Sequence, residues 1–356
     1  MIFLKKTLSV LLVIAMLFSV LGVSVSAATT ETLTAEQKTE MKIKRADVNA
    51  DGVYDTTDAK MLLKAAAGIY KPNNKYDVNL DGATSISDAL LVLKQASGIA
   101  PVVSKAELVK LFNKKLNDIK NDTPGFKKTS TATCQSMKIT QKVTATGFAA
   151  LAASSLSCTD LEYDQYVEKM TAMFESAGLS AEEQANIDAM KKSAEDYRKP
   201  QSKTYTAAKD DYYDHYKLFP REFKNTASEV TASEVSSVTF SAVDGTIVYT
   251  LKMPVKTYTE STFPSDPTTS SYGKIFNLVN VRETEGSTIN SLEFKNGKVV
   301  MTTDAATGEV KKVVYYYDYS SNIQAPRQTQ TESGLGTITI DVTTKTKANI
   351  KEIIDL

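Results

Sequence analysis

One acidic segment occurs twice near the start of the chain, and this repeat constrains the N-terminal fold more than any other feature. Residues 47–55 read DVNADGVYD and residues 77–85 read DVNLDGATS, an offset of 30. The copies also agree downstream, where AKMLLKAAAGI follows the first segment and ALLVLKQASGI follows the second. Agreement of this length at a fixed offset marks an internal repeat, so the two segments should fold alike.

Each copy has the ligand pattern of an EF-hand calcium loop. Oxygen-bearing side chains stand at loop positions 1, 3, 5, 9 and 12, position 7 offers its carbonyl, and glycine at position 6 permits a sharp turn. A flexible loop with many oxygens suits calcium better than magnesium, and neither loop has the histidine or cysteine that zinc prefers. The candidate ligands of two Ca²⁺ ions are Asp47, Asn49, Asp51, Val53, Asp55 and Asp58, and Asp77, Asn79, Asp81, Ala83, Ser85 and Asp88.

The flanks of the loops differ from those of a standard EF-hand. Position 12 is aspartate in both copies instead of the longer glutamate. No leading helix is expected before either loop, because KTEMKIKRA is short and KPNNKY reads as a turn. A helix should follow each loop and end at Gly68 or Gly98. A single loop of this composition also suits a solvated turn, but two copies in full register favour calcium.

On these motifs, residues 43–100 resemble a type I dockerin. The resemblance implies a small all-α module of two calcium-loop-helix repeats in a secreted cellulosome subunit, which docks onto a cohesin domain of a scaffoldin and serves polysaccharide breakdown. It also implies that loop positions 10 and 11 and a lysine of the following helix contact the cohesin. These residues are Thr56, Thr57 and Lys64 in the first copy and Ile86, Ser87 and Lys94 in the second. Because the two sets differ, the copies should not bind one cohesin equally well.

The first 27 residues have the order of a secretory signal: Lys5 and Lys6, an apolar run, and the small-residue site Val25-Ser26-Ala27. The alternative is a retained membrane anchor, and nothing downstream is long and apolar enough to span a bilayer. Signal removal leaves a mildly acidic chain without the basic field that nucleic acid binding requires. The protein is expected to be secreted and extracellular, with a scaffoldin complex as its route to the cell surface.

The remaining chain is predicted to be one α+β domain with N-terminal helices and a C-terminal antiparallel sheet. A helix should begin at the Ser104/Glu107 capping box, and two more should occupy residues 161–199. From about residue 234 the apolar period changes to 2, with predicted hairpins at Asp244-Gly245 and Asn296-Gly297. The predicted division is a signal peptide (1–27), a short leader (28–42), the dockerin (43–100), a linker (101–103) and the cargo domain (104–356).

The cargo domain gives no catalytic assignment. Its order of elements is similar to uncharacterised domains of exported proteins from anaerobic bacteria, which carry over no site residues. Two clusters of acids could serve a hydrolase, but both also suit a solvated helix face. The chain has no tryptophan, which disfavours a sugar-stacking cleft. The acid clusters are Asp160, Glu162 and Asp164, and Asp210, Asp211 and Asp214 beside the sole histidine, His215.

Three functions therefore stay open for the whole chain. The first is a docked subunit that presents a non-catalytic or uncharacterised cargo. The second is a polysaccharide-degrading hydrolase or a protease, expected only from the association of dockerins with such enzymes. The third is a module that binds an apolar ligand or a protein.

The chain has two cysteines, Cys134 and Cys158. In an exported protein, such a pair predicts one disulfide. The alternative is two buried free thiols.

Overall fold

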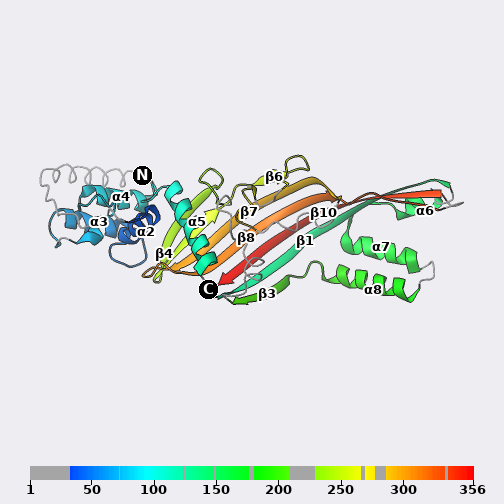
Figure 1. Cartoon of the computed structure of the whole chain (residues 1–356), viewed down its shortest axis with the longest axis horizontal. Helices are drawn as coiled ribbons and strands as arrows, with labels where there is room; N and C mark the ends of the chain where they lie inside the picture. The colour runs from blue at the N-terminus through cyan, green and yellow to red at the C-terminus, as the bar shows by residue number, and fades with distance from the viewer. Residues whose placement is uncertain are drawn as a thin grey trace, which may run out of the picture.

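A computed structural model describes residues 33–71, 73–122, 125–147, 150–175, 180–208, 229–265, 269–276, 286–332 and 336–356 of the chain. The molecule is elongated, with a cluster of short helices at one end and a long twisted sheet running away from it (Figure 1). The predicted signal peptide and the acids around His215 lie outside the described residues.

The repeat forms matching helices. Helix α3 (Thr56–Ala66) follows the first loop and α4 (Ile86–Ala96) follows the second, with a 3-10 turn η1 (Asn74–Tyr76) between them. Each helix is followed by a glycine with positive φ, +73° at Gly68 and +66° at Gly98. The predicted helices and their C-terminal glycines are therefore confirmed.

A leading helix does precede the first loop, so the prediction that there is none was wrong. Helix α2 (Ala35–Ala46) begins at a capping box in which Thr34 and Gln37 exchange hydrogen bonds. It crosses the predicted boundary between residues 42 and 43. Its buried face consists of Thr39, Ile43 and Ala46 only, a stripe too small to stand out among the surrounding lysines.

Helix α5 (Lys105–Asp122) lies between the N-terminal helices and the sheet (Figure 1). Its first turn has the predicted capping box, in which the amide of Ser104 donates to Glu107 and the amide of Glu107 donates to Ser104 Oγ. The helix has an apolar stripe that is buried throughout, at Leu108, Leu111, Phe112, Leu116 and Ile119.

Within the described residues, ten antiparallel strands form one sheet in the order β2-β1-β10-β8-β7-β5-β4, with β3 on β1, β6 on β7 and β9 on β10. The longest strands, β1, β10 and β7, extend far beyond the ordinary length of five to six residues. The strands are β1 (Gly125–Ala145), β2 (Cys158–Glu162), β3 (Gln201–Ala208), β4 (Ser237–Val243), β5 (Thr246–Lys252), β6 (Lys256–Tyr258), β7 (Thr288–Asp304), β8 (Val310–Gln324), β9 (Gln328–Glu332) and β10 (Gly336–Asp355).

The predicted order of helices first and sheet last is correct only in part. The sheet already begins at β1, and α6 (Ala150–Leu156), α7 (Tyr163–Glu175) and α8 (Ala181–Asp196) are inserted between strands. Strand β1 alternates small polar residues and lysines with few large apolar side chains, so its sequence has a weak strand pattern. Helices α7 and α8 lie within the predicted range 161–199, and α8 begins at a capping box of Ser180 and Glu183.

One predicted hairpin is confirmed and the other was wrong. Strands β4 and β5 meet at Asp244-Gly245, both with positive φ, as a type I′ turn requires. Asn296-Gly297 instead lies inside the continuous strand β7, where the register against β8 shifts between Lys295 and Lys298. This is a β-bulge, and a Cβ on Gly297 would lie 2.7 Å from the hydroxyl of Tyr272.

The tyrosine run in β8 alternates between the two faces of the sheet. Tyr315 is buried, and Tyr317 packs with its ring centroid 4.9 Å from that of Phe276. Tyr316 faces the other way, where the ammonium groups of Lys298 and Lys351 lie 4.6 and 5.6 Å from its ring centroid. The run therefore covers both sides of the sheet.

The predicted disulfide is absent, because Cys134 and Cys158 are both free and half-buried. Cys158 pairs in register with Gln141 on β1, and Cys134 lies seven positions before Gln141 on the same strand. At a strand's rise this separates them by about 23 Å. A disulfide requires Cα atoms within about 7 Å.

Alkylation of the unfolded, unreduced protein should therefore add two labels to every chain, measured by intact mass. A reduced sample serves as the control and should give the same mass. Unreduced chains that take up no label until reduction would contradict the register of β1 and β2.

Among the described residues, no helix combines the length and hydropathy of a bilayer-crossing segment.

Candidate functional site

Each loop is closed by the aspartate at its last position. Asp58 and Asp88 are fully buried, and each joins the start of its loop to the end. Oδ1 of Asp58 accepts the amide of Val48 at 2.8 Å, and its Oδ2 accepts the amide of Asp55 at 3.0 Å. Asp88 makes the same two bonds, to Val78 at 2.7 Å and Ser85 at 2.8 Å. Aspartate is shorter than the glutamate of a standard EF-hand, so these bonds hold the start and the end of each loop close together.

The aspartate at position 1 accepts two backbone amides from the turn of its loop. Asp47 accepts the amides of Asp51 at 3.1 Å and Gly52 at 3.0 Å. Asp77 accepts those of the equivalent Asp81 and Gly82 at 3.2 and 3.1 Å. The glycines have φ of +82° and +92°, the left-handed region that glycine adopts without strain. The two copies therefore share one hydrogen-bonded loop conformation.

The side chains at positions 3, 5 and 9 also accept loop amides. Asn49 Oδ1 accepts from Asp51 at 3.1 Å, and Asp51 Oδ1 accepts from Val53 at 2.8 Å. Asp55 caps helix α3 by accepting the amide of Thr57 at 2.5 Å. The second copy repeats these bonds through Asn79, Asp81 and Ser85.

Sequence reasoning missed one feature of this loop. Position 4 is also left-handed, with φ of +58° at Ala50 and +62° at Leu80. Neither residue type signals such a conformation, and only the repetition of the loop around it could have suggested one.

The electrostatics of the loops suit a cation. Burial raises the pKa of the Asp47, Asp58 and Asp88 carboxyls above the usual aspartate range. Asp58 forms no ion pair with any residue that the structure describes, and Arg45 lies 3.6 Å from Asp77 in the second loop. Buried carboxylates without a counter-charge are unfavourable, and a hard divalent ion would neutralise them.

The donor set fits calcium by its chemistry. Both loops offer carboxylates, an amide or hydroxyl oxygen and a carbonyl at the required positions. Within the described ranges, no three His, Cys, Asp or Glu side chains already form a group that could hold a metal ion. The assignment therefore rests on donor type, spacing and the repeated loop bonds.

The predicted docking residues lie at the surface. Thr56, Thr57 and Lys64 are exposed on α3, and Ser87 and Lys94 are exposed on α4, with Ile86 half-buried beside them. The two faces also differ at a pair of residues that sequence reasoning overlooked. Lys60 is exposed on α3, and Leu90, its equivalent at the offset of 30, is 46% exposed on α4. The second face is therefore the more apolar of the two.

Two acids of the first cluster in the cargo domain form ion pairs with basic residues. Asp160 pairs with Lys345 at 2.7 Å, and this hydrogen bond lowers the pKa of Asp160. Glu162 pairs with Arg198 at 2.8 Å, and although burial raises the pKa of Glu162, hydrogen bonds from Arg198 and Ser136 lower it overall. Asp164 lies in the first turn of α7. A lowered carboxyl pKa keeps the side chain ionised, as in an ion pair with a basic residue. A general acid needs a raised pKa so that its carboxyl keeps a proton to donate.

Comparison with known proteins finds a family match for the N-terminal module. Residues 46–97 match the family model of the dockerin type I domain, which lies inside the predicted range 43–100 and confirms the resemblance for this segment. No curated protein and no solved structure matches the chain.

Proposed function

We propose that this chain is a secreted subunit that docks through its type I dockerin, in a calcium-dependent manner, onto a cohesin of a scaffoldin. The observation that carries the proposal is the repeated loop: two copies with the same ligand register, the same buried closing aspartate and the same following helix. The match of residues 46–97 to the dockerin type I model, which covers both loops and both following helices, also supports it.

Type I dockerins bind calcium in general, and the proposed ligands here are the side chains at loop positions 1, 3, 5, 9 and 12 with the carbonyls of Val53 and Ala83. Two loops imply two ions. Bound calcium would neutralise the clustered carboxylates and so couple metal binding to folding of the module. The closing aspartates would orient each loop on the helix that follows it.

Export is proposed from the residues that precede the module. The order of Lys5 and Lys6, an apolar run and Ala27 is that of a signal peptide cleaved after residue 27. The mature protein would then meet its scaffoldin outside the cell.

The two docking faces should be unequal for a given cohesin. Relative to wild type, Thr56→Ala/Thr57→Ala and Ile86→Ala/Ser87→Ala should weaken binding by different factors. The more damaging variant should weaken it by about tenfold or more, since a few central residues carry most interface energy. Isothermal titration calorimetry in calcium gives both affinities. The variant with all four changes should lose binding, and wild-type affinity in that variant would contradict this assignment of the docking faces.

A further inference from the structure

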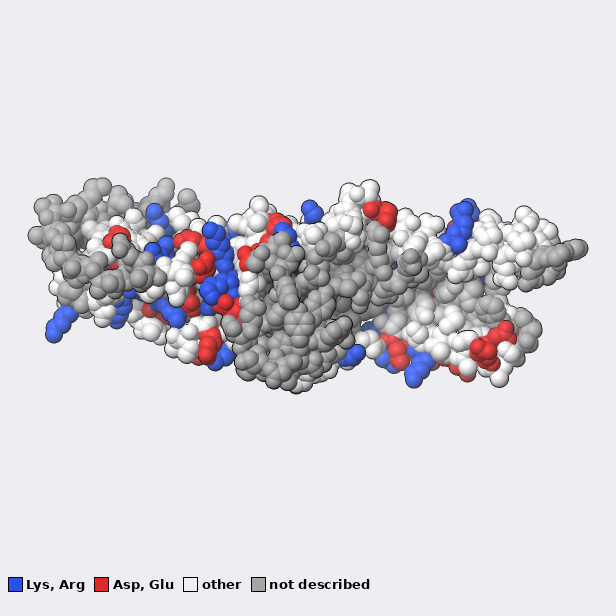
Figure 2. All heavy atoms as spheres, in the orientation of Figure 1, with Lys and Arg blue, Asp and Glu red and all other residues white. Residues whose placement is uncertain are grey.

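Helix α5 joins the dockerin module to the sheet. On one side α2 packs against it, and Lys42 of α2 pairs with Glu107 at 3.0 Å. On the other side Lys105 donates to the carbonyl of Val235, just before β4. Figure 2 shows acidic and basic side chains next to one another over this boundary. One continuous hydrophobic core runs from the module helices through α5 into the sheet.

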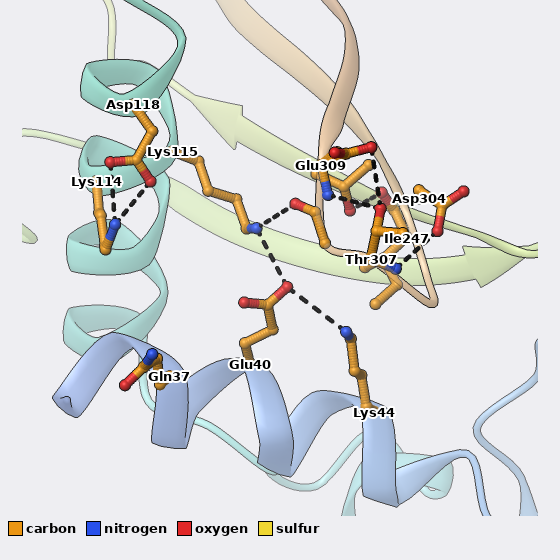
Figure 3. Close-up of polar contacts among 12 residues, drawn as sticks. Gln37, Glu40, Lys44, Lys114, Lys115, Asp118, Ile247, Asp304, Thr307 and Glu309 are labelled. Carbon is orange, nitrogen blue, oxygen red and sulfur yellow. Dashed lines mark hydrogen bonds and ion pairs between the residues drawn. The ribbon is translucent and has the colours of Figure 1, made fainter. Parts of the chain in front are cut away.

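A buried lysine on α5 connects three elements at this boundary (Figure 3). The ammonium group of Lys115, whose side chain is only 8% exposed, lies 3.2 Å from a carboxylate oxygen of Glu40 on α2. It also donates to the carbonyl of Gly308 in the β7–β8 turn at 2.7 Å. Lys44 of α2 donates to the carbonyl of Ala306 in the same turn at 3.1 Å. A Cβ on Gly308 would overlap the carboxylate of Glu40, so the turn and helix meet closely.

The first calcium loop itself contacts the sheet. A Cβ on Gly52 would lie 3.5 Å from the carbonyl oxygen of Ala242, at the tip of the β4–β5 hairpin. Tyr54, at loop position 8, packs edge-on against Phe240 of β4, with ring centroids 5.1 Å apart. Burial raises the pKa of the Tyr54 phenol, as expected for a ring held in this contact. In the second copy, Thr84 occupies the position of Tyr54.

We propose that the dockerin module, together with its leading helix α2, forms one cooperative folding unit with the sheet, joined by Lys115 and Glu40 and by contact of the first loop with the β4–β5 hairpin. The module then presents its cargo in a fixed orientation instead of on a flexible tether. The first loop contacts the β4–β5 hairpin directly, so calcium bound in this loop also stabilises the hairpin. The stabilisation of the hairpin by calcium rests on the proposed calcium binding. The joint, by which we mean the contacts of α2 and the first loop with α5 and the sheet, does not.

The joint is tested by hydrogen exchange of the full mature chain in calcium, where the module is expected to be folded. Lys115→Met leaves Glu40 with only the longer ion pair to Lys44, at 3.9 Å, and removes the lysine donor from the carbonyl of Gly308. It should speed exchange about tenfold or more both in residues 35–46 and in residues 237–252. The matched control is Lys114→Met, which removes a surface pair with Asp118 and should change neither segment by more than about twofold. An effect of Lys115→Met on one segment alone would overturn the joint.

Addition of calcium to protein held in chelator then tests the link between the first loop and the β4–β5 hairpin. In wild type it should slow exchange in residues 237–252; Asp47→Ala should abolish that slowing, and Asp77→Ala should preserve most of it. Wild-type binding of calcium without any change in residues 237–252 would overturn the link to the hairpin. Failure to bind calcium at all, measured by competition with a chelating dye, would overturn the link and the proposed function together, while the lysine variants still decide the joint.

Discussion

A chain carrying both Asp47→Ala and Asp77→Ala is expected to lose calcium-dependent docking and the calcium-induced change in its circular dichroism. Each substitution removes a position-1 ligand that also accepts two loop amides. Calcium at about 100 times its dissociation constant stabilises a folded site by about 2.7 kcal/mol, so two lost sites remove a large share of a domain's stability. Spectra of the variant, with or without calcium, should match that of the wild type in chelator.

The control for this experiment removes two aspartates outside the loops. Asp118→Ala/Asp196→Ala changes the net charge equally, and both residues lie in surface ion pairs, with Lys114 and Lys199. This variant should respond to calcium as the wild type does. A full calcium response in the Asp47/Asp77 variant would refute the ligand assignment.

The second large effect is expected far from the module, at an ion pair buried in the sheet. Lys128 of β1 lies 2.9 Å from Glu352 of β10, and their side chains are 4% and 11% exposed. Lys128→Met leaves the Glu352 carboxylate buried, with one oxygen that already has no hydrogen-bond partner. Removing one member of a buried pair typically destabilises by roughly 3–5 kcal/mol. Chemical denaturation should show this loss in the free energy of unfolding.

Two companion variants separate the buried charge from the lost side chain. Lys128→Met/Glu352→Gln should recover part of the loss, because no uncompensated charge remains. Lys312→Met breaks the exposed pair with Asp355, on the same strand as Glu352, and should change stability by no more than about 1 kcal/mol. A loss in Lys128→Met no larger than that in Lys312→Met would contradict the burial of the pair.

The candidate loops could be predicted from the sequence because their structure is local. Every loop bond of Asp47 and Asp58 joins residues within ten or so positions, and glycine at position 6 marks the turn. The contact between Tyr54 and Phe240 could not be predicted in the same way. These rings come from segments nearly two hundred residues apart, and no local pattern reports such a pairing.

The errors in the fold have the same origin. Asn296-Gly297 has the local chemistry of a hairpin turn, but β8 pairs with β7 both before and after it, and β6 and β5 pair with the two parts of β7 on the other side, so β7 stays continuous. Helix α2 has only one large buried residue, Ile43, and owes its place to packing against α5. By contrast, α5 and α8 were predictable because capping boxes at Ser104 and Ser180 mark their starts.

Binding of the mature protein to a panel of cohesins from the same cell, first with calcium and then with chelator, tests the central claim most directly. We predict tight binding to at least one cohesin in calcium and loss of that binding in chelator. Absence of binding to every cohesin, in a protein shown to hold calcium, would contradict the docking function. It would reduce the repeat to a calcium module that stabilises the sheet.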